Sequence, residues 1–279
     1  MLKVVFVVFV LFDVFQIIQG ENLNCQFKDE EIVCQFINKA FSFGNFYTCE
    51  VTSLDNTNNK MVITGHNGVH QSNKNDADVK MIFIYNTNTK YMPEGLGTLF
   101  NLTNFVSVNS QLVEINAEMF EGMDNLEGLY LGNNKLSSVP LNTFMKLTKL
   151  KLLSLIRNQI EELPNGLFKN NVNLETIHLF SNKLKFIGST LFDGLTKLNL
   201  VDLEYNVCID KEYTGSTAIT QLKEDIKVKC FNPNEIVKPR SKFLINREKV
   251  SNFLDQIMIG LMEADERLKT KATKELITN

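Results

Sequence analysis

The chain lacks several features that would point to familiar classes of protein. Its 279 residues include no tryptophan, only five prolines and only three histidines, and the formal net charge is −3. A nearly balanced charge gives no sign of the basic surface that nucleic-acid binding needs. Apolar residues make up 44% of the chain, which is enough for one or two units with a real core.

Long apolar runs are also missing, apart from one at the start. Lys3 precedes the unbroken apolar stretch Val4–Phe12, Asp13 ends it, and Gly20 offers a small residue for cleavage. This run is shorter than the about 20 residues that span a bilayer. We therefore expect residues 1–20 to be a signal peptide cleaved after Gly20, and the mature protein to be soluble and extracellular. An uncleaved membrane anchor is the alternative.

The cysteines are absent from the long interior between Cys49 and Cys208. Cys25, Cys34 and Cys49 precede it, and Cys208 and Cys230 end it, as expected for disulfide-closed caps in a secreted protein. We expect Cys25 to pair with Cys49, across short strands at 25–27 and 47–51, and Cys208 to pair with Cys230. The odd count leaves Cys34 over, free or bonded to another chain. A Cys34–Cys49 bond stays open as the competing pairing.

What fills the interior is a repeat of 24 residues. Copies begin at the following leucines: Leu102, Leu126, Leu150, Leu174 and Leu198. Position nine is asparagine in four copies, and position nineteen is phenylalanine in the four copies at Phe120, Phe144, Phe168 and Phe192. A weaker copy starts at Asp78, with Met81, Phe83, Asn86 and Leu96 in register.

This spacing resembles the L-x-x-L-x-L-x-x-N-x-L pattern of leucine-rich repeats. It predicts an α/β solenoid in which each repeat gives one short strand to a parallel concave sheet. The asparagines should bond backbone groups of the turn after the strand, and the phenylalanines should stack as a spine. We expect a cysteine-containing cap at 21–77, about six repeats at 78–207, a cap and linker at 208–240, and a helical tail at 241–279.

The repeat register also predicts which side chains project outward from the concave face of the sheet. They form an apolar set at the first repeats and an acidic set at the last: Ile82, Ile84, Val106, Val108, Tyr130, Leu152, Ile156, His178, Phe180, Leu200, Asp202 and Glu204. Outward-facing apolar side chains usually mark an interaction site. We expect an extracellular protein or a lipid-like ligand there, unless the N-terminal cap or the tail covers the patch.

The tail carries a short heptad seam. Its apolar positions are Val250, Leu254, Ile257, Leu261, Ala264 and Leu268. Spacings of four and three place them on one helix face. This seam either packs on the open end of the solenoid or joins the chain to a second copy or a different partner.

Two constellations invite a chemical interpretation, and we set both aside. Ser154, His178 and Asp202 occupy one column of successive repeats, but an open sheet offers neither an oxyanion hole nor a substrate cleft. His66 and His70 are four residues apart without a third ligand at a recognisable spacing. We therefore expect no catalysis, no cofactor and no metal. Asn101 begins the sequon Asn-Leu-Thr, a site for glycosylation.

The chain as a whole resembles the small secreted leucine-rich-repeat proteins of insects. The motifs that carry the resemblance are YTCEV at 47–51, ITGHNGVH at 63–70, DADVK at 76–80 and repeats that end in N-x-C. The signal peptide, cysteine caps and helical seam are also similar to mosquito leucine-rich-repeat immune proteins. The resemblance implies binding or scaffolding in haemolymph, with pairing through a disulfide or a coiled coil. The tail is shorter and the C-terminal cysteines are fewer than in those proteins.

Overall fold

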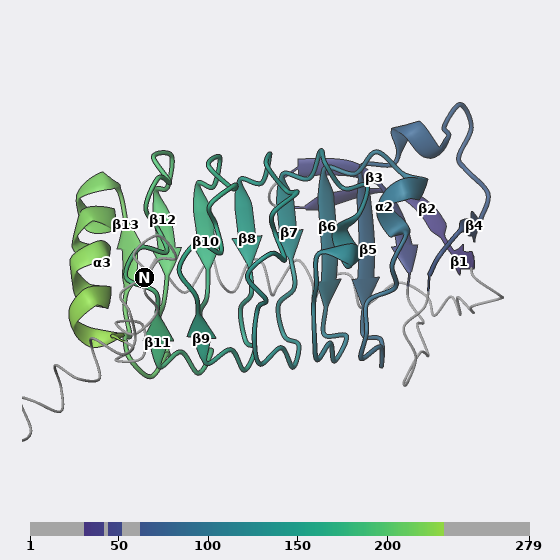
Figure 1. Ribbon diagram of the computed structural model, residues 1–279. Coiled ribbons are helices and arrows are strands. Elements are labelled where there is room, and N and C mark those ends of the chain that lie inside the picture. Colours follow the sequence, from purple (N-terminus) through teal and green to yellow (C-terminus); the bar gives the residue numbers. More distant parts are fainter. Residues whose placement is uncertain (1–30, 42–43, 52–61, 232–279) are drawn as a thin grey trace, which may run out of the picture. The chain divides into compact units, whose positions relative to one another are not determined.

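The computed structural model describes residues 31–41, 44–51 and 62–231, all of which lie in one of the chain's two compact units. The expected signal peptide, Cys25 and the helical tail lie outside the described residues. Nine strands form the main sheet in the order β13-β12-β10-β8-β7-β6-β5-β3-β2 (Figure 1). No helix in the described ranges is long and apolar enough to cross a membrane.

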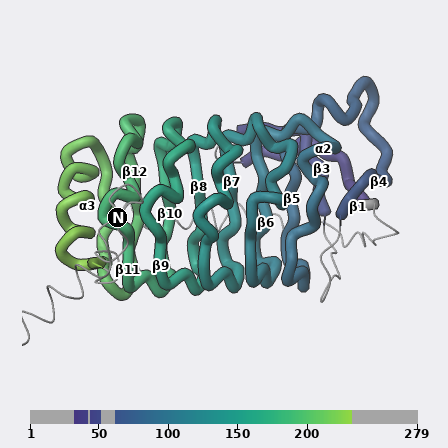
Figure 2. Tube along the Cα trace, viewed as in Figure 1, coloured from purple at the N-terminus to yellow at the C-terminus, as the bar shows by residue number. Residues whose placement is uncertain are grey.

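Six strands of this sheet come from the repeats and run parallel. They are β5 (Met81–Tyr85), β6 (Asn104–Val108), β7 (Gly128–Tyr130), β8 (Leu152–Ser154), β10 (Thr176–His178) and β12 (Leu200–Asp202). Successive turns of the chain lie side by side (Figure 2). Opposite the main sheet, β9 (Glu162–Leu163) pairs with β11 (Phe186–Ile187), and α2 (Leu96–Leu99) and η3 (Glu118–Phe120) complete two earlier turns.

The asparagine column acts as the sequence predicts. The Asn158 amide donates to the carbonyls of Leu131 and Leu155 at 2.9 and 3.0 Å, and its Oδ1 accepts from the Leu136 N–H at 3.1 Å. Each amide thus joins two neighbouring turns and satisfies backbone groups that are buried from water. Asn182 and Asn206 repeat the arrangement.

The phenylalanine column is a buried spine. Phe120, Phe144, Phe168 and Phe192 are each at most 2% exposed, and neighbouring ring centroids are 6.2 to 6.3 Å apart. The leucines of the strands pack against this spine in one continuous core. Each turn therefore buries its apolar face against its neighbours, and both ends of the stack need a cover.

The N-terminal cover is a hairpin joined to a second small sheet. β2 (Gln35–Phe41) pairs antiparallel with β3 (Gly44–Val51), and β3 pairs parallel with β5. β1 (Glu31–Val33) pairs with β4 (Gly65–Asn67), and a short 3-10 helix, η2 (Asp76–Asp78), follows.

The expected Cys25–Cys49 bond is wrong, because Cys49 is bonded to Cys34. The β2–β3 register pairs Phe36 with Cys49, so Cys34 lies beside Cys49 with 5.0 Å between their Cα atoms. Cys34 is therefore not the spare cysteine. The expected 25–27 strand lies outside the described residues, and the strand that pairs with 47–51 is β2.

The C-terminal cover is a strand and a helix. β13 (Glu212–Thr214) pairs antiparallel with β12, and α3 (Ser216–Lys229) buries Ile219, Leu222 and Ile226 against the last repeat. The Cys208–Cys230 disulfide joins the end of the repeats to the end of α3, and it is the pair expected from the sequence. Sequence reasoning did not anticipate α3, which lies in the region assigned to cap and linker.

The register predicted for the first repeat is wrong by one residue. β5 pairs Ile82 with Phe105 and Ile84 with Ser107, so both isoleucines face the core rather than the concave side. Asn86 matches Asn109, and both have left-handed backbone, with φ of 54° and 56°. The position filled by asparagine in later repeats is here Thr87. The first repeat therefore runs from Val79 and is one residue shorter than the others.

Candidate functional site: the concave face of the sheet

The parallel register aligns concave side chains in rows across the strands. The middle row, in order from β3 to β12, is Glu50, Phe83, Val106, Tyr130, Ser154, His178 and Asp202. One flanking row includes Met81, Asn104, Gly128, Leu152, Thr176 and Leu200. The 24-residue period places Val108, Ile156, Phe180 and Glu204 in the other. Ten of the twelve predicted face residues therefore belong to these rows, and Met81, Phe83 and Tyr85 replace Ile82 and Ile84.

The N-terminal half of this face is covered by the β2–β3 hairpin. Met81, Phe83, Val106 and Tyr130 form a separate buried cluster, each at most 8% exposed. Two phenylalanines of the hairpin, Phe41 and Phe46, pack against it, and Phe41 lies 5.8 Å from Phe83 between ring centroids. The N-terminal cap therefore covers the apolar side chains of the first repeats, which is the alternative that the sequence left open for the concave face.

A lysine of the β2–β3 hairpin also packs against this buried cluster. Lys39 Nζ lies 4.4 Å from the centroid of the Phe83 ring and 2.9 Å from Glu50 Oε2, and both charged side chains are about nine-tenths buried. A cation over an aromatic face is attracted by the ring quadrupole, and the carboxylate balances its charge. Burial also raises the pKa of Tyr130 well above its usual value. These residues form a second, small core rather than an open surface.

The C-terminal half of the face is more open. The side chains of Leu152, Ile156, Phe180 and Leu200 lie half-buried across β8 to β12. Tyr205 follows β12 with left-handed backbone, is 66% exposed, and meets the edge of Phe180 with ring centroids 4.9 Å apart. Glu204 lies at the same end. This half presents an aromatic pair beside a carboxylate, and we call it the open face.

Ser154, His178 and Asp202 are brought together, but not as a catalytic triad. The strand register places His178 between the other two, with Nδ1 4.0 Å from Asp202 Oδ2. That distance exceeds a hydrogen bond, and His178 Nδ1 has no hydrogen-bond partner among the described residues. Burial lowers the pKa of His178 to about 4, which makes it a weak base near neutral pH. The Ser154 hydroxyl makes no hydrogen bond to His178 within the described part of the chain.

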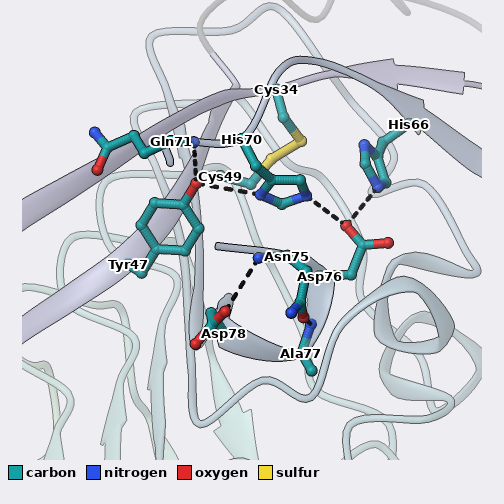
Figure 3. Close-up of polar contacts among 10 residues, drawn as sticks. All are labelled: Cys34, Tyr47, Cys49, His66, His70, Gln71, Asn75, Asp76, Ala77 and Asp78. Carbon is teal, nitrogen blue, oxygen red and sulfur yellow. Dashed lines mark hydrogen bonds and ion pairs between the residues drawn. A yellow bond between two sulfur atoms is a disulfide. The ribbon is translucent and has the colours of Figure 1, made fainter. Parts of the chain in front are cut away.

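The two other histidines lie together in the N-terminal cap. His66 and His70 both point at Asp76 (Figure 3), and the two Nε2 atoms each lie 2.8 Å from Asp76 Oδ1. From the sequence alone, these histidines are expected to be cap residues, because no third ligand stands at a recognisable spacing. Asp76 is that missed third group, and the turn between His70 and Asp76 brings it back to them. Spacing alone carried no signal for it.

The sequon at Asn101 lies on the surface. Its side chain is exposed and accepts a hydrogen bond from Asn125 Nδ2 at 2.7 Å. The hydroxyl of Thr103, the third residue of the sequon, is 3.3 Å from the Lys80 carbonyl. The structure therefore places the asparagine of the sequon in contact with solvent, and its glycosylation stays a prediction.

The leucine rich repeat family pattern matches residues 101–160 and 148–207. Among solved structures, the chain is similar to the LRIM1/APL1C complex, at 22% identity and a TM-score of 0.48, over 57% of this chain and 29% of that one. It is also similar to the Drosophila Toll–Spatzle complex, at 25% identity and a TM-score of 0.44, over 46% of this chain and 18% of that one.

A third similar structure is a leucine-rich-repeat protein of Leptospira interrogans, at 23% identity and a TM-score of 0.44. That match covers 52% of this chain and 35% of the other, so the chain spans no more than about a third of the length of these three proteins. No curated protein sequence matches the chain significantly. The strand register, the asparagine column and the family match together show that the fold is a leucine-rich-repeat solenoid.

Proposed function

We propose that the protein is a secreted binding module that holds a protein partner on the open face. The observation that carries the proposal is the Phe180–Tyr205 pair, in which the Tyr205 side chain stays mostly exposed against half-buried Phe180. Apolar and aromatic groups that remain in contact with water are typical of interaction sites. The hairpin that covers Phe83 does not bury this end.

The chemistry of the open face favours a particular kind of partner surface. Glu204 lies beside Phe180 and Tyr205, so the matching surface would present an apolar side chain next to a lysine or arginine. A lipid-like ligand would instead need its chain enclosed away from water. Secretion is supported by the two disulfides, which persist in oxidising compartments. The resemblance to insect secreted proteins makes haemolymph the first fluid to search.

The test compares two double variants of the secreted protein. Ile156→Asp with Phe180→Asp places two charges on the open face, whereas Met145→Asp with Val172→Asp changes two exposed apolar residues outside the concave rows. Proteins captured from extracellular fluid are identified, and a purified partner is titrated against each variant. We expect the first variant to lose binding at least 100-fold and the second to bind as the parent does. Equal binding by both variants would remove the open face as the site.

Assembly through the remaining cysteine and the tail is the second candidate. Four cysteines are paired in the structure, which leaves Cys25 as the odd one of five. The seam from Val250 to Leu268, outside the described residues, would bring two chains together, and Cys25 would bond them. Non-reducing electrophoresis of the secreted protein should show a covalent dimer that Cys25→Ser abolishes. A monomer from both proteins, with monomer mass in solution, would exclude assembly.

A further inference from the structure

The cap contains three potential metal ligands that converge from separate segments. His66 lies in β4, His70 in the loop that follows, and Asp76 at the first residue of η2. Their ligand atoms all lie within 4.8 Å of one another. Both imidazoles aim Nε2 at the same carboxylate oxygen (Figure 3). Among the described residues, this is the one group of three such side chains close enough to share an ion.

Aromatic packing fixes the two imidazoles before any ligand arrives. Phe36 stacks on His70 with centroids 3.9 Å apart and meets His66 edge-on at 5.3 Å. The ring centroids of Phe100 and His66 are 5.1 Å apart. The histidine side chains are only 16% and 18% exposed, which leaves them little rotational freedom. Ligands held in this way lose little conformational entropy when they bind an ion.

The backbone of the segment is held equally closely. The Cys34 N–H donates to the Asn67 carbonyl at 2.7 Å, next to the Cys34–Cys49 disulfide. A Cβ at Gly68 would lie 2.4 Å from the Cys34 carbonyl oxygen, so only glycine permits this close approach. Asn75 caps η2 by accepting from the Ala77 N–H at 2.9 Å, and this orients Asp76.

The other ring nitrogen of His70 has a hydrogen-bonding partner. His70 Nδ1 lies 3.2 Å from the Tyr47 hydroxyl, whose oxygen also accepts from the Gln71 N–H at 3.0 Å. In the neutral tautomer whose Nε2–H donates to Asp76, Nδ1 accepts from the tyrosine hydroxyl. With an ion on Nε2, the proton moves to Nδ1, which then donates to the tyrosine oxygen. This is the outer contact that metal-bound histidines usually make.

We propose that His66 Nε2, His70 Nε2 and Asp76 Oδ1 bind one divalent transition-metal ion, with Zn²⁺ as the matching probe. Two imidazoles and a carboxylate are a ligand set that Zn²⁺ accepts in tetrahedral geometry, with bonds of about 2.0–2.2 Å. Those bonds require ligand atoms about 3.3–3.5 Å apart, so each 2.8 Å contact opens by about half an ångström. Asp76 is 52% exposed, so the fourth position faces water.

The alternative is a purely structural clip, in which Asp76 simply accepts two hydrogen bonds. The substitution Asp76→Asn separates the two, because the amide oxygen still accepts both hydrogen bonds but is a poor ligand for Zn²⁺. The substitution Tyr47→Phe removes the outer contact of His70 without touching the ion. Outer contacts of this kind typically contribute about 10- to 100-fold to metal affinity.

The experiment titrates Zn²⁺ into the full-length secreted chain, without a histidine tag and freed of metal with a chelator, and follows binding by calorimetry and by the melting temperature. We expect one Zn²⁺ per chain, a melting temperature that rises to a plateau, and tetrahedral Co²⁺ absorption when Co²⁺ replaces Zn²⁺. His66→Gln, His70→Gln and Asp76→Asn should each weaken binding at least 100-fold, and Tyr47→Phe about 10-fold.

Matched controls lie elsewhere in the same chain. His178→Gln changes the remaining histidine, and Asp78→Asn changes the other carboxylate of η2, which bonds Asn75 and Lys74 instead. Both should bind Zn²⁺ as the parent does. Circular dichroism of each metal-free variant identifies any that fails to fold, and Asp76→Asn, which keeps both hydrogen bonds, decides the question. Unchanged affinity in Asp76→Asn, or no saturable binding by the parent at 100-fold excess Zn²⁺, would overturn the proposal.

Discussion

The two halves of the concave face are formed by the same rows of side chains but differ in burial. Over β5 to β7 the middle row is Phe83, Val106 and Tyr130, sealed beneath the β2–β3 hairpin. Over β8 to β12 the same row is Ser154, His178 and Asp202, with half-buried Ile156 and Phe180 beside it. One half therefore contributes to stability as a second core, whereas the other keeps Ile156 and Phe180 only half-buried among the described residues.

The largest expected effect is on the covered half. Phe83→Ala removes a fully buried ring and should lower the free energy of unfolding by about 3–5 kcal/mol. Phe180→Ala, at a half-buried ring of the open face, should lower it by about 1 kcal/mol. Urea unfolding of both variants measures the difference. Equal losses would mean that the two halves are packed alike.

The asparagine column, which is occupied by Ser110 in an earlier repeat, gives a second contrast between the halves. Asn158→Ala deletes an amide that donates to three carbonyls and accepts from one N–H, and should cost about 2–3 kcal/mol. Ser110→Ala, at the same position two repeats earlier, deletes a hydroxyl with one bond to the Val108 carbonyl and should cost about 1 kcal/mol. Thermal unfolding of the pair checks the order, and a larger loss for Ser110→Ala would contradict it.

His178 gives the open half a dependence on pH. Its pKa is lowered to about 4 in the fold because burial disfavours the cation, whereas an unfolded histidine titrates near pH 6.5. Above about pH 6.5 both states are neutral and stability is complete. As the pH falls from about 6.5 to 4, the unfolded state takes up the proton first, and stability drops by on the order of 2 kcal/mol.

The matching measurement is urea unfolding of the parent and of His178→Gln between pH 7.5 and pH 4. The difference in unfolding free energy between the two proteins should shift in favour of the variant as the pH falls. A constant difference across this range would show that His178 is solvated in the fold.

The smallest stability effect is expected at Tyr205. Its side chain is mostly exposed and touches Phe180 only edge-on, so Tyr205→Ala should change the free energy of unfolding by no more than about 0.5 kcal/mol. The same substitution should weaken partner binding about 10-fold, because exposed tyrosines at interfaces are frequent hot spots. A large loss of stability would instead make Tyr205 part of the core.

The difference between the halves also explains where sequence reasoning succeeded. In the later repeats, leucines alternate with polar residues and an asparagine follows at a fixed distance, so the register is unambiguous. In β5 every residue from Met81 to Tyr85 is apolar or aromatic, because both faces of that strand are buried. Alternation of apolar and polar residues is then absent, so the sequence does not reveal that this repeat is one residue shorter than the others. The register error over Ile82 and Ile84 follows from this.

The N-terminal cap was harder to predict for a different reason. Which of Cys25 and Cys34 reaches Cys49 depends on the hairpin register, and cysteine spacing does not encode it. The grouping of His66, His70 and Asp76 likewise depends on a turn in an irregular segment. The repeats are predictable because their copies share one residue pattern and can be compared with each other. The cap occurs once, so no such comparison is possible.

Oxidative footprinting of the free protein and of its complex with the purified partner tests the division of the concave face most directly. Tyr205 and Phe180 report on the open face, and Tyr85 and Val172 report on the covered half and on the surface outside the rows. We predict protection of Tyr205 and Phe180 on binding, with Tyr85 and Val172 unchanged. Protection of Val172 with Tyr205 still reactive would contradict partner binding by the open face.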